Sequence, residues 1–146
     1  MSDFRALSDR VLASPQLTLA DVAEASAMGV KLIVNNRPEG EAEDQTPGEA
    51  IEAAARAAGM DYLALPVTPG SFDEAQVRAM SDALKAPNGS ILAYCRSGTR
   101  STLLWALARA ASGEPLEAIA SAASAAGYDL SPILPAMAEL SKRAQS

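Results

Sequence analysis

The chain has 146 residues, 49% of them hydrophobic and 21% charged, which suits one ordinary globular domain over residues 1–146. Its net charge of −6 argues against nucleic-acid binding, and the absence of histidine together with a single cysteine excludes a Cys/His metal site and an intramolecular disulfide. No apolar run approaches the ~20 residues that cross a bilayer, and no signal-peptide core is present, so we expect a soluble cytoplasmic protein without a cofactor.

Strand and helix patterns alternate along the chain. In chain order the expected elements are strands at 4–7 and 11–13, a helix at 18–28, a strand at 30–34, a helix at 46–58, a strand at 62–67, a helix at 71–85, a strand at 91–94, and helices at 100–112, 116–126 and 132–143. Helix starts are indicated by Thr18 with Asp21, by Thr46 before Pro47, and by Ser71 as a third cap. A turn is expected at residues 87–89. This alternation predicts a single α/β domain with a central, mostly parallel sheet flanked by helices.

The segment between the strand at 91–94 and the next helix is the most informative one. It reads Cys95-Arg96-Ser97-Gly98-Thr99-Arg100-Ser101 and contains the chain's one cysteine. Such a loop at a helix N-terminus directs backbone N–H groups inward as an anion cradle, and the same field favours a thiolate. A lone cysteine at a strand end is most often a small core hydrophobe. The two arginines and the small hydroxyl residues favour a nucleophile that faces an oxyanion.

A second polar loop, at residues 35–41, also follows a strand and is expected on the same sheet edge as Cys95. Arg37 in this loop is either a solvated arginine, a positive group at the edge of the cradle, or a prop for the cysteine loop. Glu39 and Glu41 are interpreted as solvated rather than catalytic. Trp105, in an apolar helical run, is expected in the core and not as a substrate platform.

Residues 34–41, Leu65-Pro66-Val67 and residues 94–101 together resemble the phosphatase-like domain family found joined to beta-lactamase-hydrolase-like proteins. The resemblance extends from about Leu12 to Ala138. It implies a protein-tyrosine-phosphatase-like fold with a thiolate loop. Members of the family are described as cysteine phosphatases or as sulfur transferases, and some are fused to sulfide-oxidising enzymes, which implies a functional link to such enzymes.

Two departures from the phosphatase pattern favour sulfur transfer. In the motif of cysteine phosphatases the arginine follows the cysteine after five residues (Cys-x5-Arg), and Ser101 occupies that arginine's position here. Arg100 follows Cys95 after only four residues, which resembles the Cys-x4-Arg spacing of rhodanese-type sulfurtransferases. Dual-specificity phosphatases place a general acid just after the strand that ends at Val67, where this chain has Thr68-Pro69-Gly70. The nearest carboxylate is Asp73, which a helix start also explains. Without an acid an alkoxide leaves slowly, whereas sulfite leaves thiosulfate without a proton.

We therefore expect a sulfurtransferase in which Cys95 takes up a sulfane sulfur as a persulfide and passes it to a low-molecular-weight thiol. Arg100 and the loop N–H groups bind the small anionic substrate. Further anion contacts are expected from Arg96, Ser97, Gly98, Thr99, Ser101 and Arg37. The alternative is a phosphatase that forms a cysteinyl-phosphate, with Ser101 aiding release and Asp73 as the acid. A third possibility is a non-catalytic anion-binding module.

Overall fold

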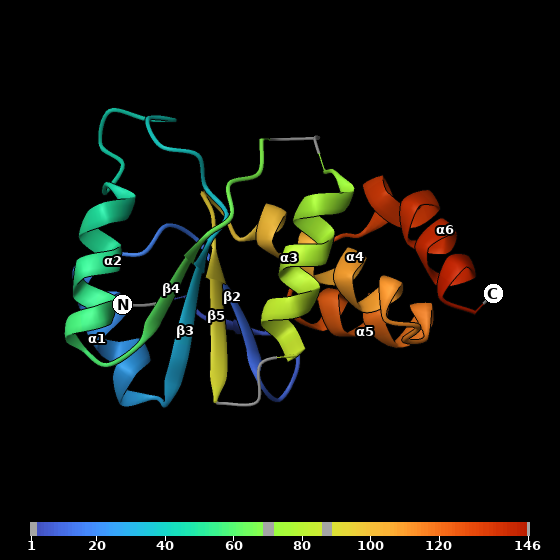
Figure 1. Ribbon diagram of the computed structural model, residues 1–146, viewed down its shortest axis with the longest axis horizontal. Helices are drawn as coiled ribbons and strands as arrows, with labels where there is room; N and C mark the ends of the chain where they lie inside the picture. The colour runs from blue at the N-terminus through green and yellow to red at the C-terminus, as the bar shows by residue number, and fades with distance from the viewer. Residues whose placement is uncertain (1–2, 69–71, 86–88, 146) are drawn as a thin grey trace.

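The computed structural model describes residues 3–68, 72–85 and 89–145, and shows a five-stranded sheet between two layers of helices (Figure 1). The strands are β1 (Arg5–Ala6), β2 (Val11–Ser14), β3 (Val30–Asn35), β4 (Asp61–Ala64) and β5 (Ser90–Tyr94). Their order across the sheet is β1-β2-β5-β3-β4, and only the β1–β2 pair is antiparallel. The predicted α/β class with a mostly parallel sheet is confirmed.

Helices cover both faces of this sheet. They are α1 (Leu19–Ala27), α2 (Gly48–Ala57), α3 (Glu74–Lys85), α4 (Thr99–Ala111), α5 (Leu116–Ala125), the short 3-10 turn η1 (Ser131–Ile133) and α6 (Leu134–Gln145). The helices α1 and α2 lie on one face, and α3 to α6 form the other layer (Figure 1). The helix expected at 132–143 therefore begins as a 3-10 turn before it becomes α-helical.

Helix α4 lies at the centre of the second layer and is buried almost continuously from Arg100 to Ala108. Trp105 is 2% exposed, which confirms its expected place in the core. Leu104 and Met137 of the same apolar cluster are fully buried. Because the chain enters α4 directly from Cys95, this packing holds the N-terminus of the helix rigidly at the end of β5.

The helix starts were predicted with mixed success. At α1 the capping box is confirmed, since Thr18 Oγ1 accepts from the Asp21 N–H at 3.1 Å and the Asp21 carboxylate accepts from the Thr18 N–H at 2.9 Å. The Thr46 cap is wrong, because α2 begins after Pro47 and the Glu39 carboxylate accepts from the Gly48 N–H at 2.8 Å. A full negative charge satisfies a helix N-terminus better than a hydroxyl. The expected cap Ser71 and residues 87–88 of the expected turn lie outside the described residues.

Candidate functional site

Three segments meet at the carboxyl edge of the parallel strands. The Asn36 N–H donates to the Tyr94 carbonyl at 2.8 Å, and the Val67 N–H donates to the Asn36 carbonyl at 2.9 Å. The loop after β3 and the chain after β4 are thus held beside the loop that joins β5 to α4 (Figure 1). This edge is where ligands bind in open α/β sheets.

Cys95 lies fully buried at the base of the β5–α4 loop. The Gly98 N–H donates to Cys95 Sγ at 3.1 Å. Gly98 has a φ of +89°, and a Cβ at this position would collide with the Tyr128 hydroxyl. The tight turn that aims a backbone donor at the sulfur therefore requires glycine.

The backbone of this loop has unused donors. The N–H groups of Arg96, Ser97, Arg100 and Ser101 donate to no other described residue, and the Thr99 N–H makes only a 3.4 Å contact with Ser97 Oγ. The N–H groups of Thr99, Arg100 and Ser101 belong to the first turn of α4, where N–H groups have no intrahelical acceptor. Unpaired N–H groups around a helix N-terminus favour an anion, as the sequence analysis expected of this loop.

The Arg100 guanidinium is held on two sides. Its Nη1 and Nη2 donate to the two carboxylate oxygens of Glu41, each at 2.8 Å, and Nη1 also donates to the Val67 carbonyl at 2.7 Å. These bonds use both Nη1 hydrogens and one Nη2 hydrogen, so Nε–H and the second Nη2–H stay available along one edge of the fork. The hydrogen bond with Glu41, and after it the nearby Cys95 sulfur, raise the pKa of Arg100. A planar edge with two donors beside the sulfur matches two oxygens of an oxyanion.

Glu41 is the residue that fixes Arg100. The residue is exposed, as expected, but its carboxylate is held in ion pairs. Its side chain is 20% exposed and contacts both Arg100 and Arg37. The hydrogen bond from Arg100 is the main cause that lowers the pKa of Glu41 to about 2, with Arg37 contributing. Glu41 follows Arg37 by four residues in the sequence. This spacing of opposite charges is the signal that could have indicated the salt bridge between them.

Arg37 acts as a prop, and the solvated interpretation is wrong. The residue is 5% exposed, and its Nε donates to Glu41 at 2.9 Å while Nη1 donates to Gln16 Oε1 at 3.0 Å. The Gln16 N–H in turn donates to the Arg96 carbonyl at 3.3 Å. Arg37 thereby connects Glu41 to the first residues of the cysteine loop.

The remaining loop side chains are in three different settings. Ser101 is fully buried, and its hydroxyl donates to Asn36 Oδ1 at 2.8 Å, so it ties α4 to the β3 loop. Ser97 and Thr99 pair through their hydroxyls at 3.0 Å. Arg96 is exposed, and its guanidinium makes no hydrogen bond or ion pair within the described part of the chain. Arg96 is therefore a free positive charge at the loop.

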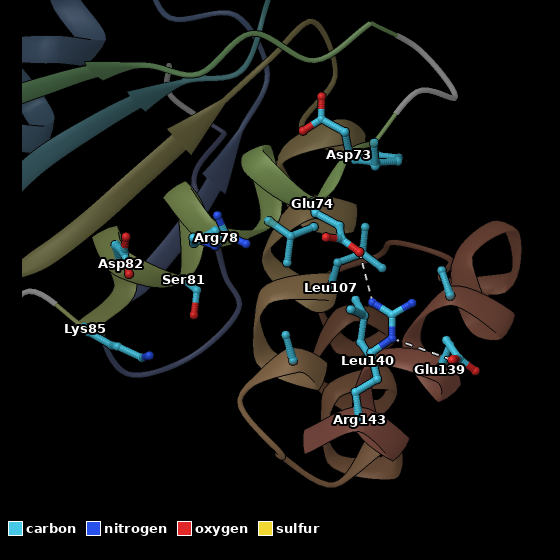
Figure 2. A pocket seen from close by; sticks show the side chains of 14 residues that line it. Asp73, Glu74, Arg78, Ser81, Asp82, Lys85, Leu107, Glu139, Leu140 and Arg143 are labelled. Atoms are coloured by element: carbon cyan, nitrogen blue, oxygen red, sulfur yellow. Dashed lines mark hydrogen bonds and ion pairs between the residues drawn. The ribbon is translucent and has the colours of Figure 1, made fainter. Parts of the chain in front are cut away.

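Within the described residues, Asp73 makes no hydrogen bond or ion pair with the cysteine loop. Its N–H donates to Gln76 Oε1 and its carboxylate accepts from the Gln76 N–H, both at 2.8 Å, which forms the N-terminal cap of α3. Figure 2 shows Asp73 at one end of a cleft of about 460 Å³ between α3, α4 and α6, where Arg143 bridges Glu74 and Glu139. No residue of the 95–101 segment lines this cleft.

The sequence analysis missed Tyr128. It is 8% exposed, its hydroxyl donates to the Ser97 carbonyl at 3.4 Å, and the Arg5 guanidinium lies 5.3 Å from the centre of its ring. Burial raises the pKa of Tyr128. Nothing near Tyr128 in the sequence signals this contact, because the loop it touches is 31 residues away.

Among residues 3–68, 72–85 and 89–145, no group of three or more His, Cys, Asp or Glu side chains is placed to hold a metal ion. In the same residues no helix is both long and apolar enough to cross a membrane.

Comparison with known proteins agrees with this geometry. A family model described as "Beta-lactamase hydrolase-like protein, phosphatase-like domain" matches residues 3–112. A beta-lactamase hydrolase-like protein of Agrobacterium fabrum is 36% identical over 107 residues, which are 73% of this chain and 25% of that protein. The chain thus spans about a quarter of the length of the curated relatives it matches.

Solved structures share the whole fold. The crystal structure of a candidate phosphatase from Neisseria meningitidis has a TM-score of 0.84 and 33% identity, and the match covers 96% of this chain and 99% of that one. TpbA from P. aeruginosa, solved in complex with phosphotyrosine, has a TM-score of 0.67 and 19% identity over 99% of this chain and 91% of its own. At that identity the TpbA likeness concerns the fold alone.

Proposed function

We propose that this chain, which belongs to the phosphatase-like domain family of beta-lactamase hydrolase-like proteins, hydrolyses phosphomonoesters through a covalent intermediate on Cys95. The sequence analysis placed this activity second, behind sulfur transfer. The phosphatase-like family and the 33%-identical structure from Neisseria meningitidis support a cysteine-dependent enzyme of this kind.

The observation that carries the proposal is the setting of Arg100. The Cys-x4-Arg spacing was interpreted as favouring sulfur transfer, because it resembles that of rhodanese-type sulfurtransferases. In the folded chain, Glu41 and the Val67 carbonyl hold Arg100 with a two-donor edge unused, close enough to the sulfur for Cys95 to raise the pKa of Arg100. The shorter spacing therefore gives no reason to reject phosphate.

The chemistry follows from these groups in two steps. The Cys95 thiolate attacks the phosphorus, a sulfur–phosphorus bond forms, and the ester oxygen departs with the electrons of the broken phosphorus–oxygen bond and takes a proton from solvent. Water then attacks the cysteinyl-phosphate, the sulfur–phosphorus bond breaks, and inorganic phosphate and the thiolate are released. In both steps Arg100 and the loop N–H groups stabilise the charge on the phosphoryl oxygens.

The proposed substrates have good leaving groups. Asp73 caps α3 and binds no residue of the cysteine loop, so the mechanism assigns it no proton transfer. An aryl ester needs little protonation as it leaves, whereas an alkyl ester depends on an acid. We therefore expect aryl phosphates to be hydrolysed much faster than alkyl phosphates.

Sulfur transfer is the second candidate, and the same observation about Asp73 favours it. Sulfite leaves thiosulfate without a proton, and the Arg100 edge with the free N–H groups suits either oxyanion. In this route Cys95 attacks the outer sulfur of thiosulfate, the sulfur–sulfur bond breaks, and sulfite departs with its electrons. An acceptor thiolate then attacks the outer sulfur of the Cys95 persulfide, the bond from this sulfur to Sγ breaks, and Cys95 leaves as the thiolate with the electrons of that bond.

One experiment compares the two activities on the same preparation. Turnover of an aryl phosphate and cyanide-dependent thiocyanate release from thiosulfate are measured for the wild type and for Cys95→Ser. The proposal expects Cys95-dependent release of inorganic phosphate. Thiocyanate release without phosphate release would replace it with the sulfurtransferase, and binding of oxyanions without either turnover would indicate the non-catalytic module.

A further inference from the structure

A hollow lies where the chain passes from the end of α5 through η1 to the start of α6. Its volume is about 410 Å³, and Ala120, Leu130, Leu134 and the ring of Tyr128 contribute its apolar lining. Leu134 is 44% exposed, whereas Leu130 is 4% exposed and forms part of the buried core. The hollow thus has a fixed apolar base and one open apolar wall, and its volume is in the range of small-molecule sites.

Tyr128 joins this hollow to the anion cradle. Its ring lines the hollow, while its hydroxyl bonds the Ser97 carbonyl and fills the space that a side chain on Gly98 would need. Arg5 fixes the ring in place, since it lies over the ring at 5.3 Å and donates to the Ala126 carbonyl at 3.1 Å. Tyr128 therefore contacts both the cysteine loop and the hollow.

The polar part of the lining includes one carboxylate. Asp129 contributes a carboxylate that accepts from the Ser131 N–H at 2.9 Å and from its hydroxyl at 2.6 Å, and these bonds lower the pKa of Asp129. A fixed negative charge at this position repels a second anionic group on the substrate. An uncharged aromatic or branched alkyl group instead buries its surface against Leu130, Leu134 and the Tyr128 ring.

From these observations we infer that the hollow between Tyr128 and Leu134 is a specificity subsite for an uncharged, apolar group carried by the substrate's ester oxygen. The inference rests on the proposed function, because it takes the cradle beside Cys95 as the position of the phosphoryl group. The proposed substrate class is phosphomonoesters of bulky, apolar phenols.

The test uses two non-hydrolysable probes on the whole chain, phenylphosphonate and naphthylphosphonate, with binding measured by calorimetry. We expect the naphthyl compound to bind the wild type more tightly, and Leu134→Asp to weaken it by about tenfold while phenylphosphonate binding changes little. Leu19→Asp is the matched control, since Leu19 is 54% exposed on α1 and does not line the hollow. It should leave both affinities unchanged.

Three results would overturn the inference: equal affinities of the two probes for the wild type, an unchanged ratio in Leu134→Asp, or the same loss in both aspartate variants. Turnover of naphthyl phosphate is measured in parallel. A preserved preference for the naphthyl probe without turnover would reject the proposed reaction and leave the subsite standing. Turnover without that preference would reject the subsite alone.

Discussion

Glu41 grips the end of the Arg100 guanidinium with both carboxylate oxygens, at 2.8 Å each, and so leaves the side edge of the fork for a substrate. The two residues are 59 positions apart in the sequence. Arg37 Nε also donates to Glu41 Oε1, at 2.9 Å. The arginine that the proposed reaction needs is thus positioned by a carboxylate that does not itself contact the oxyanion.

Glu41→Gln should reduce kcat/KM for an aryl phosphate on the order of 10²-fold, because Arg100 loses its charged bidentate partner and its edge is no longer fixed. The comparison of kcat with KM identifies the role. A positioning residue lowers kcat, whereas a residue that only attracts the substrate raises KM. Glu43→Gln, an exposed carboxylate in the same loop, is the control and should be silent. Equal effects in the two variants would contradict the role given to Glu41.

Glu41 should also make stability depend on pH in a defined window. Its folded pKa is about 2, against an ordinary value of 4.5, so the stabilisation is present above about pH 4.5 and is lost as the pH falls toward 2. Unfolding free energies of the wild type and Glu41→Gln, measured by urea titration at several pH values, should therefore converge at acid pH. A constant difference across this range would show that Glu41 is not held by the arginines.

Arg37→Met should destabilise the fold by about 2 kcal/mol, because a buried guanidinium with two charged or polar partners is lost and Glu41 keeps only one arginine. The matched control is Arg56→Met, whose ion pair with Glu52 is exposed and should be worth about 0.5 kcal/mol or less. Chemical denaturation measures both. Similar small losses would indicate that Arg37 is a solvated loop residue after all.

Gly98→Ala should cost more than the conformational strain of a positive φ, which is about 1–2 kcal/mol. The added Cβ meets the Tyr128 hydroxyl, whereas at Gly40, with a φ of +73°, it meets nothing within 4 Å. The loss of stability in Gly40→Ala therefore measures the conformational strain of a positive φ without a collision. Tyr128→Phe removes the colliding oxygen, so Gly98→Ala should be less costly in that background, and thermal unfolding of the four variants tests this. Equal costs at both glycines would contradict the collision.

Asp73→Asn should leave the rate and pH profile of aryl phosphate hydrolysis unchanged, because asparagine caps a helix as well as aspartate does. Asp73→Ala should lower stability by about 1 kcal/mol through the lost cap, again without a change in rate. Steady-state kinetics over a range of pH, beside unfolding curves, separates the two effects. Loss of one limb of the pH profile in Asp73→Asn would restore Asp73 as the general acid.

The sequence predicts the fold well because its signals are local. The apolar runs that became β3 and β5 and the capping box at Thr18 act over a few residues, and the structure confirms them. The cysteine loop was found for the same reason, since strand, glycine and helix follow one another directly. Thr46 failed as a cap because its competitor, Glu39, comes from a loop whose course depends on tertiary structure.

The rest of the candidate site depends on contacts between distant segments. In the sequence, Glu41 looks like any acidic loop residue, because only the fold brings Arg100 next to it. Tyr128 lies in a connection between helices, and no nearby motif indicates its contact with Ser97. The interpretation of the Cys-x4-Arg spacing as evidence for sulfur transfer likewise did not include contacts between distant segments. The direction of the Arg100 side chain is set by Glu41 and Val67, and counting residues from Cys95 does not include either of them.

The most direct test of the account is intact-mass spectrometry of the wild type, acid-quenched within milliseconds to seconds of mixing with an aryl phosphate. The proposed mechanism requires a fraction of protein heavier by one phosphoryl group, with the modification on Cys95 and none in Cys95→Ser. An unmodified chain that releases no phosphate, but gains one sulfur on Cys95 when thiosulfate replaces the phosphate ester, would contradict it.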